Sequence, residues 1–263
     1  MNKWLQISIW AVVLVLIAVL LAFINNQRAV MVFHKPIINI DYETENRFVD
    51  EKDVLNQIIN PNDSIPLLGN AINVNHLEEK IKNNPAIKDA EVYKTIDGNL
   101  MLEVKQRRPI VRISPKNNTG YYIDENGLLM PLSNKYTSRV LVVNGFLNEP
   151  FAKRYRFNFA HLNDSIIDKT LLDDVYKISK FIDQSDFWKA QIEQIYVNKE
   201  LDFELIPKVG NHKIVLGGVR NLEAKFKKLM IFYKKGLNKT GWNEYSTINL
   251  KYKNQVVCTK MYN

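Results

Sequence analysis

A run of twenty residues without a charge lies near the start of the chain, and it constrains the fold more than any other feature of the sequence. It extends from Leu5 to Ile24 and reads LQISIWAVVLVLIAVLLAFI. As a helix it would be about 30 Å long, which is the thickness of the hydrocarbon core of a bilayer. Trp4 and Trp10 lie near its beginning, where interfacial aromatic residues are common. The run therefore predicts a transmembrane helix.

Two other interpretations of this run fit less well. A cleaved signal peptide has a shorter apolar core and a cleavage site between small residues, whereas this run ends in Phe23, Ile24, Asn25 and Asn26. A helix in the core of a soluble protein usually keeps a polar stripe, but this run is apolar on every face. We therefore expect an anchor that is retained in the mature protein.

The positive charges around the run give only a weak indication of its orientation. Lys3 precedes it, while Arg28 and Lys35 follow it. Because a large domain that follows a first hydrophobic segment is normally translocated, we expect the N-terminus in the cytoplasm and the bulk of the chain outside it. The expected parts are a cytoplasmic head (1–4), an anchor in the cytoplasmic membrane (5–24) and a linker (25–35).

The residues from 36 to 109 show the pattern of a small α+β module. Two helices are predicted by apolar residues at helical spacing, the first with Asp50 as its N-cap. Asp97-Gly98 is a strong signal for a tight turn between two strands. The expected order of strand, helix, helix, strand and strand is carried by Ile37–Ile40; Val54, Leu55, Ile58 and Ile59; Val74, Leu77 and Ile81; Ala90 and Val92; and Leu100, Leu102 and Val104.

The second module, 110–263, is predicted to be rich in strands and to contain two helices. One helix is indicated by Leu171, Val175, Ile178 and Ile182, and the other by Leu222, Phe226, Leu229, Met230 and Tyr233 with its end at Gly236. Ser246 to Thr259 is expected to form one extended segment. Further strands are indicated at Tyr121–Asp124, Leu128–Met130, Leu141–Val143, Ile195 and Val197, Phe203 and Leu205, and Ile214–Leu216.

No pattern in the sequence predicts an enzyme, a cofactor or a metal site. The four histidines, His34, His76, His161 and His212, lack metal-ligand spacing and are expected at the surface or in loops. Nucleophile-elbow, phosphate-loop and dinucleotide fingerprints do not occur. Asp173 and Asp174 stand at the start of a helix, where carboxylates oppose the helix dipole, so a catalytic pair is the weaker interpretation.

Charge and cysteine content exclude further classes. The net charge of +8 comes from lysines spread along the chain, so nucleic-acid binding is not expected. A solvated helix face is the expected role of Lys225, Lys227, Lys228, Lys234 and Lys235, and contact with an anionic surface is the alternative. The single cysteine, Cys258, forms no internal disulfide, so packing alone must stabilise the domains.

The order and spacing of several short segments resemble the bacterial cell-division family FtsQ/DivIB over nearly the whole chain. One departure lies in the hairpin turn, where the family often has an aromatic-proline pair and this chain has Ile96-Asp97-Gly98. The segments that carry the resemblance are Asn84–Val92, Leu100–Val104, Arg107–Val111, Tyr122–Leu128, Val140–Gly145, Ile214–Gly217 and Ile248–Val257.

The resemblance implies a POTRA-like domain over 36–109, an FtsQ-type β domain over 110–263 and a non-enzymatic scaffold at the division septum. It implies recruitment of an FtsB/FtsL pair for septal cell-wall synthesis, and contact between the POTRA-like domain and upstream division proteins. The alternatives are a membrane-tethered POTRA chaperone or outer-membrane biogenesis factor, and an extracytoplasmic hydrolase.

The last strand is the predicted partner-binding site, because a terminal strand is often a sheet edge that can accept a strand from a partner. Tyr252, Asn254, Val256 and Cys258 are expected on one face of this strand, and Lys251, Lys253 and Gln255 on the other. The full predicted site is Lys251, Tyr252, Lys253, Asn254, Gln255, Val256, Val257 and Cys258. A strand that is merely paired and packed is the alternative.

Overall fold

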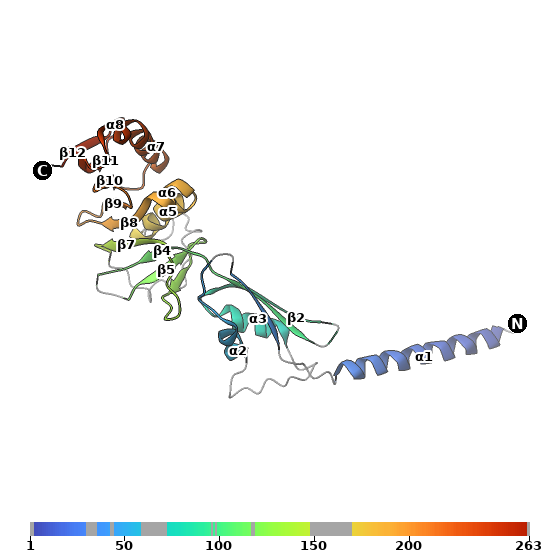
Figure 1. Ribbon diagram of the computed structural model, residues 1–263. Coiled ribbons are helices and arrows are strands. Elements are labelled where there is room, and N and C mark those ends of the chain that lie inside the picture. Colours follow the sequence, from blue (N-terminus) through green and yellow to red (C-terminus); the bar gives the residue numbers. More distant parts are fainter. Residues whose placement is uncertain are drawn as a thin grey trace. The chain divides into compact units, whose positions relative to one another are not determined.

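The computed structural model in Figure 1 divides the chain into two compact units, Met1–Gln106 and Arg107–Asn263. The division falls three residues before the boundary expected from the sequence. The structure describes residues 3–29, 36–42, 45–58, 73–95, 97, 99–116, 119–147 and 170–261.

The predicted anchor lies within one helix, α1 (Lys3–Ala29). Its described apolar side chains are exposed, as at Trp10 and Leu14. In the part of the chain that the structure describes, no helix combines the length and the apolar character needed to cross a membrane. The helix continues to Ala29, so the first five residues of the predicted linker are helical.

The first unit has the predicted order of elements. A three-stranded sheet in the order β1-β3-β2 is built from β1 (Ile37–Asp41), β2 (Ile87–Lys94) and β3 (Leu100–Gln106). β3 runs parallel to β1 and antiparallel to β2. Two helices, α2 (Glu51–Ile58) and α3 (Val74–Lys82), contribute Val54, Ile58, Leu77 and Ile81 to its core. The predicted Ile59 and Gly98 lie outside the described residues.

Local hydrogen bonds explain where α2 begins. The Asp53 N–H donates to the Asp50 side chain at 2.8 Å, and the Asp50 N–H donates to the Asp53 side chain at 3.0 Å. This reciprocal pair satisfies two amide groups that a helix start leaves open. The predicted N-cap is confirmed.

A buried side chain, Gln106, joins the end of β3 to the segment before α2. Its Oε1 accepts from the N–H groups of Phe48, at 2.7 Å, and Val49, at 3.1 Å. Its Nε2 donates to the Asn46 carbonyl at 3.1 Å. These bonds fasten a stretch without regular secondary structure to the sheet.

The second unit contains a nine-stranded sheet in the order β12-β11-β10-β9-β8-β7-β4-β5-β6. Parallel pairs join β7 to β4 and β8, and β10 to β11; the other neighbours are antiparallel. The strands are β4 (Pro109–Ile113), β5 (Tyr121–Asp124), β6 (Leu129–Pro131), β7 (Leu141–Gly145), β8 (Ile192–Val197), β9 (Phe203–Pro207), β10 (Lys213–Gly217), β11 (Tyr245–Asn249) and β12 (Val257–Lys260).

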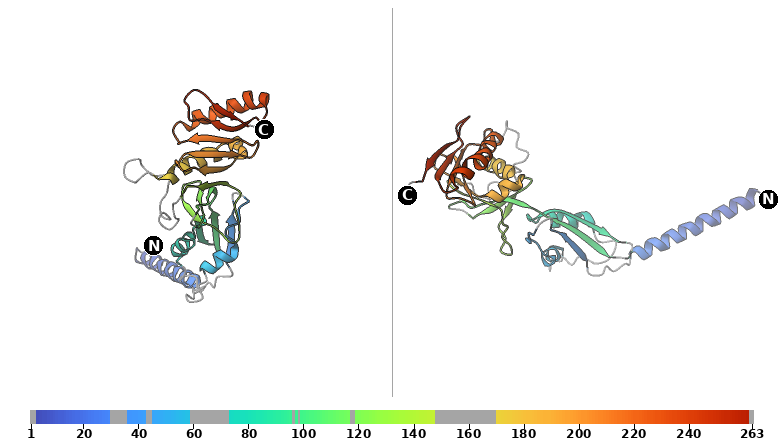
Figure 2. Two further views of the ribbon diagram at one scale, coloured as in Figure 1. Left: turned by 90° about the vertical axis from the view of Figure 1, so that its left-hand side faces the viewer. Right: turned by 45° about the horizontal axis from the view of Figure 1, so that its top comes forward.

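The helices of this unit pack on one side of the sheet, as Figure 2 shows, and all of them but the short last one share one hydrophobic core with it. They are α5 (Leu171–Asp183), α6 (Asp186–Gln191), α7 (Leu222–Phe232) and α8 (Asn238–Thr240). The two predicted helices are present as α5 and α7, but α6 was missed and the helical segment that begins with α7 does not end at Gly236. The chain instead continues through a π-helical turn (Tyr233–Leu237) into α8.

One predicted surface histidine is buried. His212 is only 3% exposed, and its Nε2 lies 3.1 Å from the Tyr233 hydroxyl. Burial lowers the pKa of His212, which favours the neutral ring. His76 is exposed, as predicted. His34 and His161 lie outside the described residues.

Candidate functional site

The last strand, β12, forms one end of the nine-stranded sheet and pairs with β11. Val257, Thr259 and Lys260 are exposed, whereas Cys258 is half-buried against the core. At the other end of the sheet, β6 has buried Leu129 and Met130 and carries a proline. Among the described strands of this sheet, β12 is therefore the more accessible edge.

The hydrogen bonds of β11 identify the backbone groups that β12 leaves open. Leu250 donates its N–H to the Val215 carbonyl of β10 at 2.9 Å. Because successive residues of a strand direct their backbone groups to opposite sides, Asn249 faces β12, where it pairs with Val257. We infer that the N–H and C=O of Cys258 point away from β11, toward the open edge.

The predicted strand Lys251–Cys258 was too long and ended too early. Only Val257 and Cys258 of the eight predicted residues lie in β12, which continues to Lys260. The residues from Lys251 to Val256 form the connection from β11 instead. The single extended segment expected from Ser246 to Thr259 is thus two antiparallel strands, and the predicted alternation of faces does not hold before Val257.

Side chains from outside the connection hold it in place. The Lys228 ammonium of α7 donates to the carbonyls of Leu250 at 3.1 Å, of Tyr252, and of Gln255 at 3.4 Å. The side chain of Asn249, the last residue of β11, also accepts the Lys251 N–H at 2.9 Å. The position from which β12 starts therefore depends on one lysine of a helix.

A second lysine of α7 binds the backbone at the other end of the connection from β10 through α7 to β11, where β10 ends. Lys225 donates to the carbonyls of Leu216, at 2.8 Å, and Gly218, at 2.6 Å. The expectation that Lys225 and Lys228 only decorate a solvated face was wrong. Burial lowers the pKa of both amines; for Lys225 the charge of Lys228 adds to the effect.

Lys251 also forms an ion pair that joins the connection to Asp202, the residue directly before β9. Its Nζ lies 2.5 Å from Asp202 Oδ2, and this bond with the carboxylate raises the pKa of Lys251. The stem of Lys251 lies over Gly217, where an added Cβ would approach its Cγ to 2.9 Å. Because Gly217 has no side chain, it leaves room for that of Lys251.

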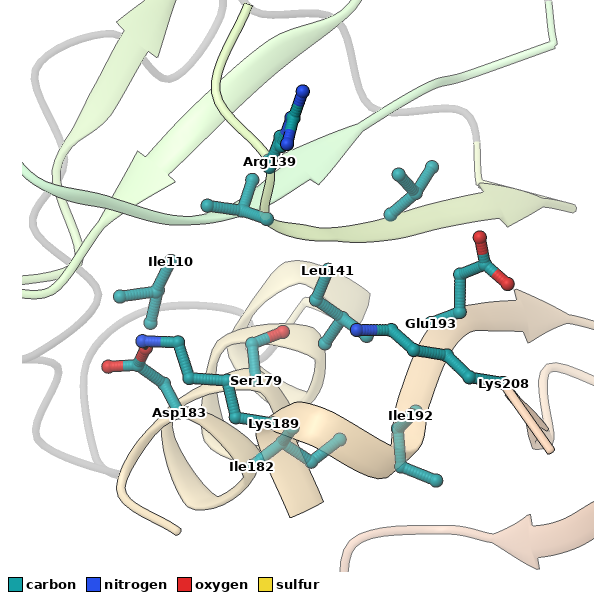
Figure 3. Close-up of a pocket in the computed structure, with 12 residues that line it drawn as sticks. Ile110, Arg139, Leu141, Ser179, Ile182, Asp183, Lys189, Ile192, Glu193 and Lys208 are labelled. Atoms are coloured by element: carbon teal, nitrogen blue, oxygen red, sulfur yellow. The ribbon is translucent and has the colours of Figure 1, made fainter. Parts of the chain in front are cut away.

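A cavity of about 270 Å³ lies at the N-terminal ends of β4, β7 and β8, as Figure 3 shows. The buried Ser179 hydroxyl lines it and has no hydrogen-bond partner among the residues that the structure describes. Asp183 also lines it but is held by Arg108, at 2.8 and 3.0 Å, and by Lys189, at 2.9 Å. Burial alone would raise the pKa of Asp183, but the bonds with Arg108 and Lys189 outweigh burial and lower the pKa. The carboxylate is therefore a weak base.

Comparison with protein families matches each unit to a model. Residues 108–259, more than half of the chain, match the family described as FtsQ/DivIB, C-terminal related. The chain belongs to this family. Residues 34–105 match the POTRA-like domain. No curated protein matches the chain.

The match to the FtsQ/DivIB C-terminal-related family extends from the start of β4 into β12. The family resemblance expected from the sequence is thereby confirmed, as is an α+β chain with a POTRA-like domain followed by a β-rich domain. The matched segment contains all eight predicted site residues, although their role in binding stays a prediction.

Sequence reasoning missed several residues that form this FtsQ/DivIB-related edge. Thr259 and Lys260 lie in β12 but were outside the predicted site. Ser246, at an irregularity in the β11–β12 pairing, donates its hydroxyl to the Thr259 carbonyl at 3.3 Å. The available signal was local: Asn249 and the run from Lys251 to Gln255 contain side chains that favour turns.

Proposed function

We propose that the chain is a non-enzymatic scaffold of the division machinery that captures FtsB/FtsL-type partners at β12 and so regulates septal cell-wall synthesis. The observation that carries the proposal is the open edge of β12 within a domain of the FtsQ/DivIB C-terminal-related family. An extended partner segment placed there would add a tenth strand to the sheet.

The chemistry of this edge suits an extended segment. Backbone bonds to Cys258 would provide adhesion without sequence preference. The exposed side chains of Val257 and Thr259 lie on the strand face opposite to Cys258 and would contact alternate residues of the partner. Specificity would therefore come from one face of the added strand.

A proline substitution separates the backbone role from the side-chain role. Cys258→Pro removes the N–H that faces the open edge while leaving the Val257 and Thr259 pairing groups intact. We expect it to weaken binding of a purified FtsB/FtsL-type pair about fivefold or more in biolayer interferometry. The matched control, Cys258→Ala, retains the N–H and should bind within about twofold of the unchanged chain. Equal affinities of the two variants, with circular dichroism confirming folding, would contradict strand addition.

We also propose that Leu5–Ile24 anchors the chain in the cytoplasmic membrane, with a cytoplasmic N-terminus and an extracytoplasmic bulk. The absence of charge over twenty residues supports this, together with the exposure of side chains such as Leu14. A Lys239→Cys variant in a Cys258→Ser background would test it. An impermeant maleimide should label this cysteine in intact spheroplasts. Labelling only after lysis would contradict the proposed orientation and place the bulk of the chain in the cytoplasm.

The POTRA-like domain is proposed to contact upstream division proteins. Its sheet has two terminal strands, β1 and β2. On β2 the side chains of Glu78 and Asp89 accept the N–H groups of Val92 and Ala90, so we propose β1 as the edge that a partner strand would use. A chain lacking residues 36–106 should lose its mid-cell position in fluorescence microscopy. Normal septal localisation of that chain would refute this assignment.

The POTRA-like match also supports a second candidate, a membrane-tethered chaperone or outer-membrane biogenesis factor. Depletion distinguishes the two. The division role predicts mid-cell bands and filamentous cells after depletion, whereas the second candidate predicts an even envelope signal and normal division.

A further inference from the structure

A groove runs between α7 and the pair α5 and α6. It consists of two hollows of about 420 and 460 Å³. Both are lined by Phe181 and Glu223, so they form one continuous depression. The remaining lining residues are Lys177, Val219, Asn221, Leu222 and Ala224 in the first hollow and Trp188, Phe226, Lys227, Met230, Ile231, Lys234 and Lys235 in the second.

The groove has the length of a short helix. Along α7 and into the π-helical turn, the lining residues Leu222, Phe226, Met230 and Lys234 recur at every fourth position. At a rise of 1.5 Å per residue, this row extends over about 18 Å. A partner helix of about twelve residues would cover that length, whereas a small molecule would fill only a fraction of it.

The floor of the groove is apolar and firmly packed. The Phe226 ring lies 4.7 Å from that of Phe181 and 5.0 Å from that of Trp188, measured between centroids. Phe226 and Trp188 are buried, so the floor keeps its shape without a ligand. Above this floor Ile231 remains 49% exposed. Such exposure of a large aliphatic side chain beside aromatic rings favours an apolar partner surface.

The rim of the groove is positively charged. Four lysines line it, Lys177 from α5 and Lys227, Lys234 and Lys235 from α7 and the π-helical turn. Glu223 is the single carboxylate among the described lining residues. The lysines that hold the backbone, Lys225 and Lys228, do not line the groove. The groove therefore presents a net positive rim around an apolar floor.

We propose that this groove binds an acidic amphipathic helix of a partner protein. The apolar face of such a helix would rest on Phe181, Met230 and Ile231 above the buried Phe226, while its carboxylates would meet the lysines of the rim. The proposal does not depend on capture at β12, since it uses other side chains of α7. It adds a second interaction surface of a different kind.

A designed peptide tests the groove without knowledge of the partner. The probe is a fluorescein-labelled, stapled helix of about eighteen residues with leucines at helical spacing and glutamates on both flanks. One control peptide replaces every glutamate by glutamine, and another scrambles the leucine positions. Fluorescence anisotropy measures binding to the full-length chain in detergent micelles. We expect the acidic amphipathic probe to bind and its affinity to fall as salt is raised.

Charge reversal locates the binding site. The double variant Lys227→Glu/Lys234→Glu should weaken the probe about tenfold or more. Lys239→Glu, at a residue of α8 that does not line the groove, should stay within about twofold, and Cys258→Pro should leave the affinity unchanged. Equal binding of either control peptide, an unchanged affinity of the double variant, or loss with Cys258→Pro would overturn the proposal. So would binding of phosphatidylglycerol vesicles at these lysines when the probe does not bind, because a membrane surface would then be the ligand.

Discussion

Replacement of Lys228 by methionine tests how the fold positions the proposed binding edge. The Lys228 ammonium donates to three carbonyls of the β11–β12 connection, those of Leu250, Tyr252 and Gln255. Methionine preserves an unbranched apolar side chain, so Lys228→Met removes mainly the charge and its hydrogen bonds. The connection then loses its attachment to α7, while the β11–β12 backbone pairs remain.

The expected loss follows from the kind of bond and its exposure. A hydrogen bond that involves a charged group contributes about 1.5–3 kcal/mol when it is well shielded. The Tyr252 and Gln255 bonds are exposed to solvent, which weakens them, so we expect about 1–2 kcal/mol in total. If this free energy stabilises β12 locally, β12 should open about 5 to 30 times more often in the variant.

Hydrogen exchange measures this opening directly. In the full-length protein at neutral pH, the peptide that contains Val257 and Thr259 should exchange faster by that factor in Lys228→Met, while β5 keeps its protection. Lys227→Met is the matched control, because Lys227 lines the groove and holds no backbone carbonyl of the connection. Unchanged protection of β12 in Lys228→Met, or equal acceleration in both variants, would show that the lysine does not fix the edge.

Three further predictions concern the two units separately. Gln106→Leu removes three buried hydrogen bonds and should lower the free energy of unfolding of the first unit by about 2–4 kcal/mol in urea titrations; a change below about 1 kcal/mol would contradict the bonding described. Gly145 has φ +103°, and an added Cβ would lie 2.2 Å from the Val197 carbonyl oxygen. Gly145→Ala should therefore cost about 2 kcal/mol or more in thermal melts, and an unchanged melting temperature would refute the clash. Burial lowers the pKa of His212, so the unfolded chain takes up a proton near pH 6.5 that the folded chain does not. Stability of the second unit should fall as pH drops from about 7 toward the lowered pKa, and His212→Gln should remove this fall; an identical pH profile would argue against it.

Most helices could be predicted because their apolar residues repeat at helical spacing. Val54 and Ile58 in α2, and Val175, Ile178 and Ile182 in α5, face the core as that spacing requires. The six residues of α6 are too few to display a period, and only its N-cap Ser185 marks its start. The continuation of the helical segment past Gly236, through the π-helical turn into α8, likewise has no local signal, because packing of Tyr233 and Leu237 into the core decides it.

The predicted course of the last strand was wrong where contacts distant in sequence decide the structure. The residues from Ser246 to Thr259 fit an extended chain, but Lys228 and Asp202 hold the connection after Leu250 in another shape. His212 reads as a loop residue, and its burial follows from packing beside Tyr233 and Trp242. The burial of His212 cannot be derived from the pattern of neighbouring residues, whereas for the connection Asn249 and Asn254 indicate a turn but not its shape.

The strength of the open edge limits what β12 can do alone. The groups we place there are the N–H and C=O of Cys258 and, by the same alternation, the N–H of Lys260. Three such bonds would contribute about 3 kcal/mol, whereas association costs at least about 4 kcal/mol. An edge of this size therefore needs additional contacts, from Val257 and Thr259 or from a second surface such as the groove. Confinement to one membrane would raise the effective concentration of the partner, and a gain of about a thousandfold equals about 4 kcal/mol. The proposed anchor thus adds to the side-chain contacts at β12, because confinement offsets part of the cost of association that three backbone bonds alone do not cover.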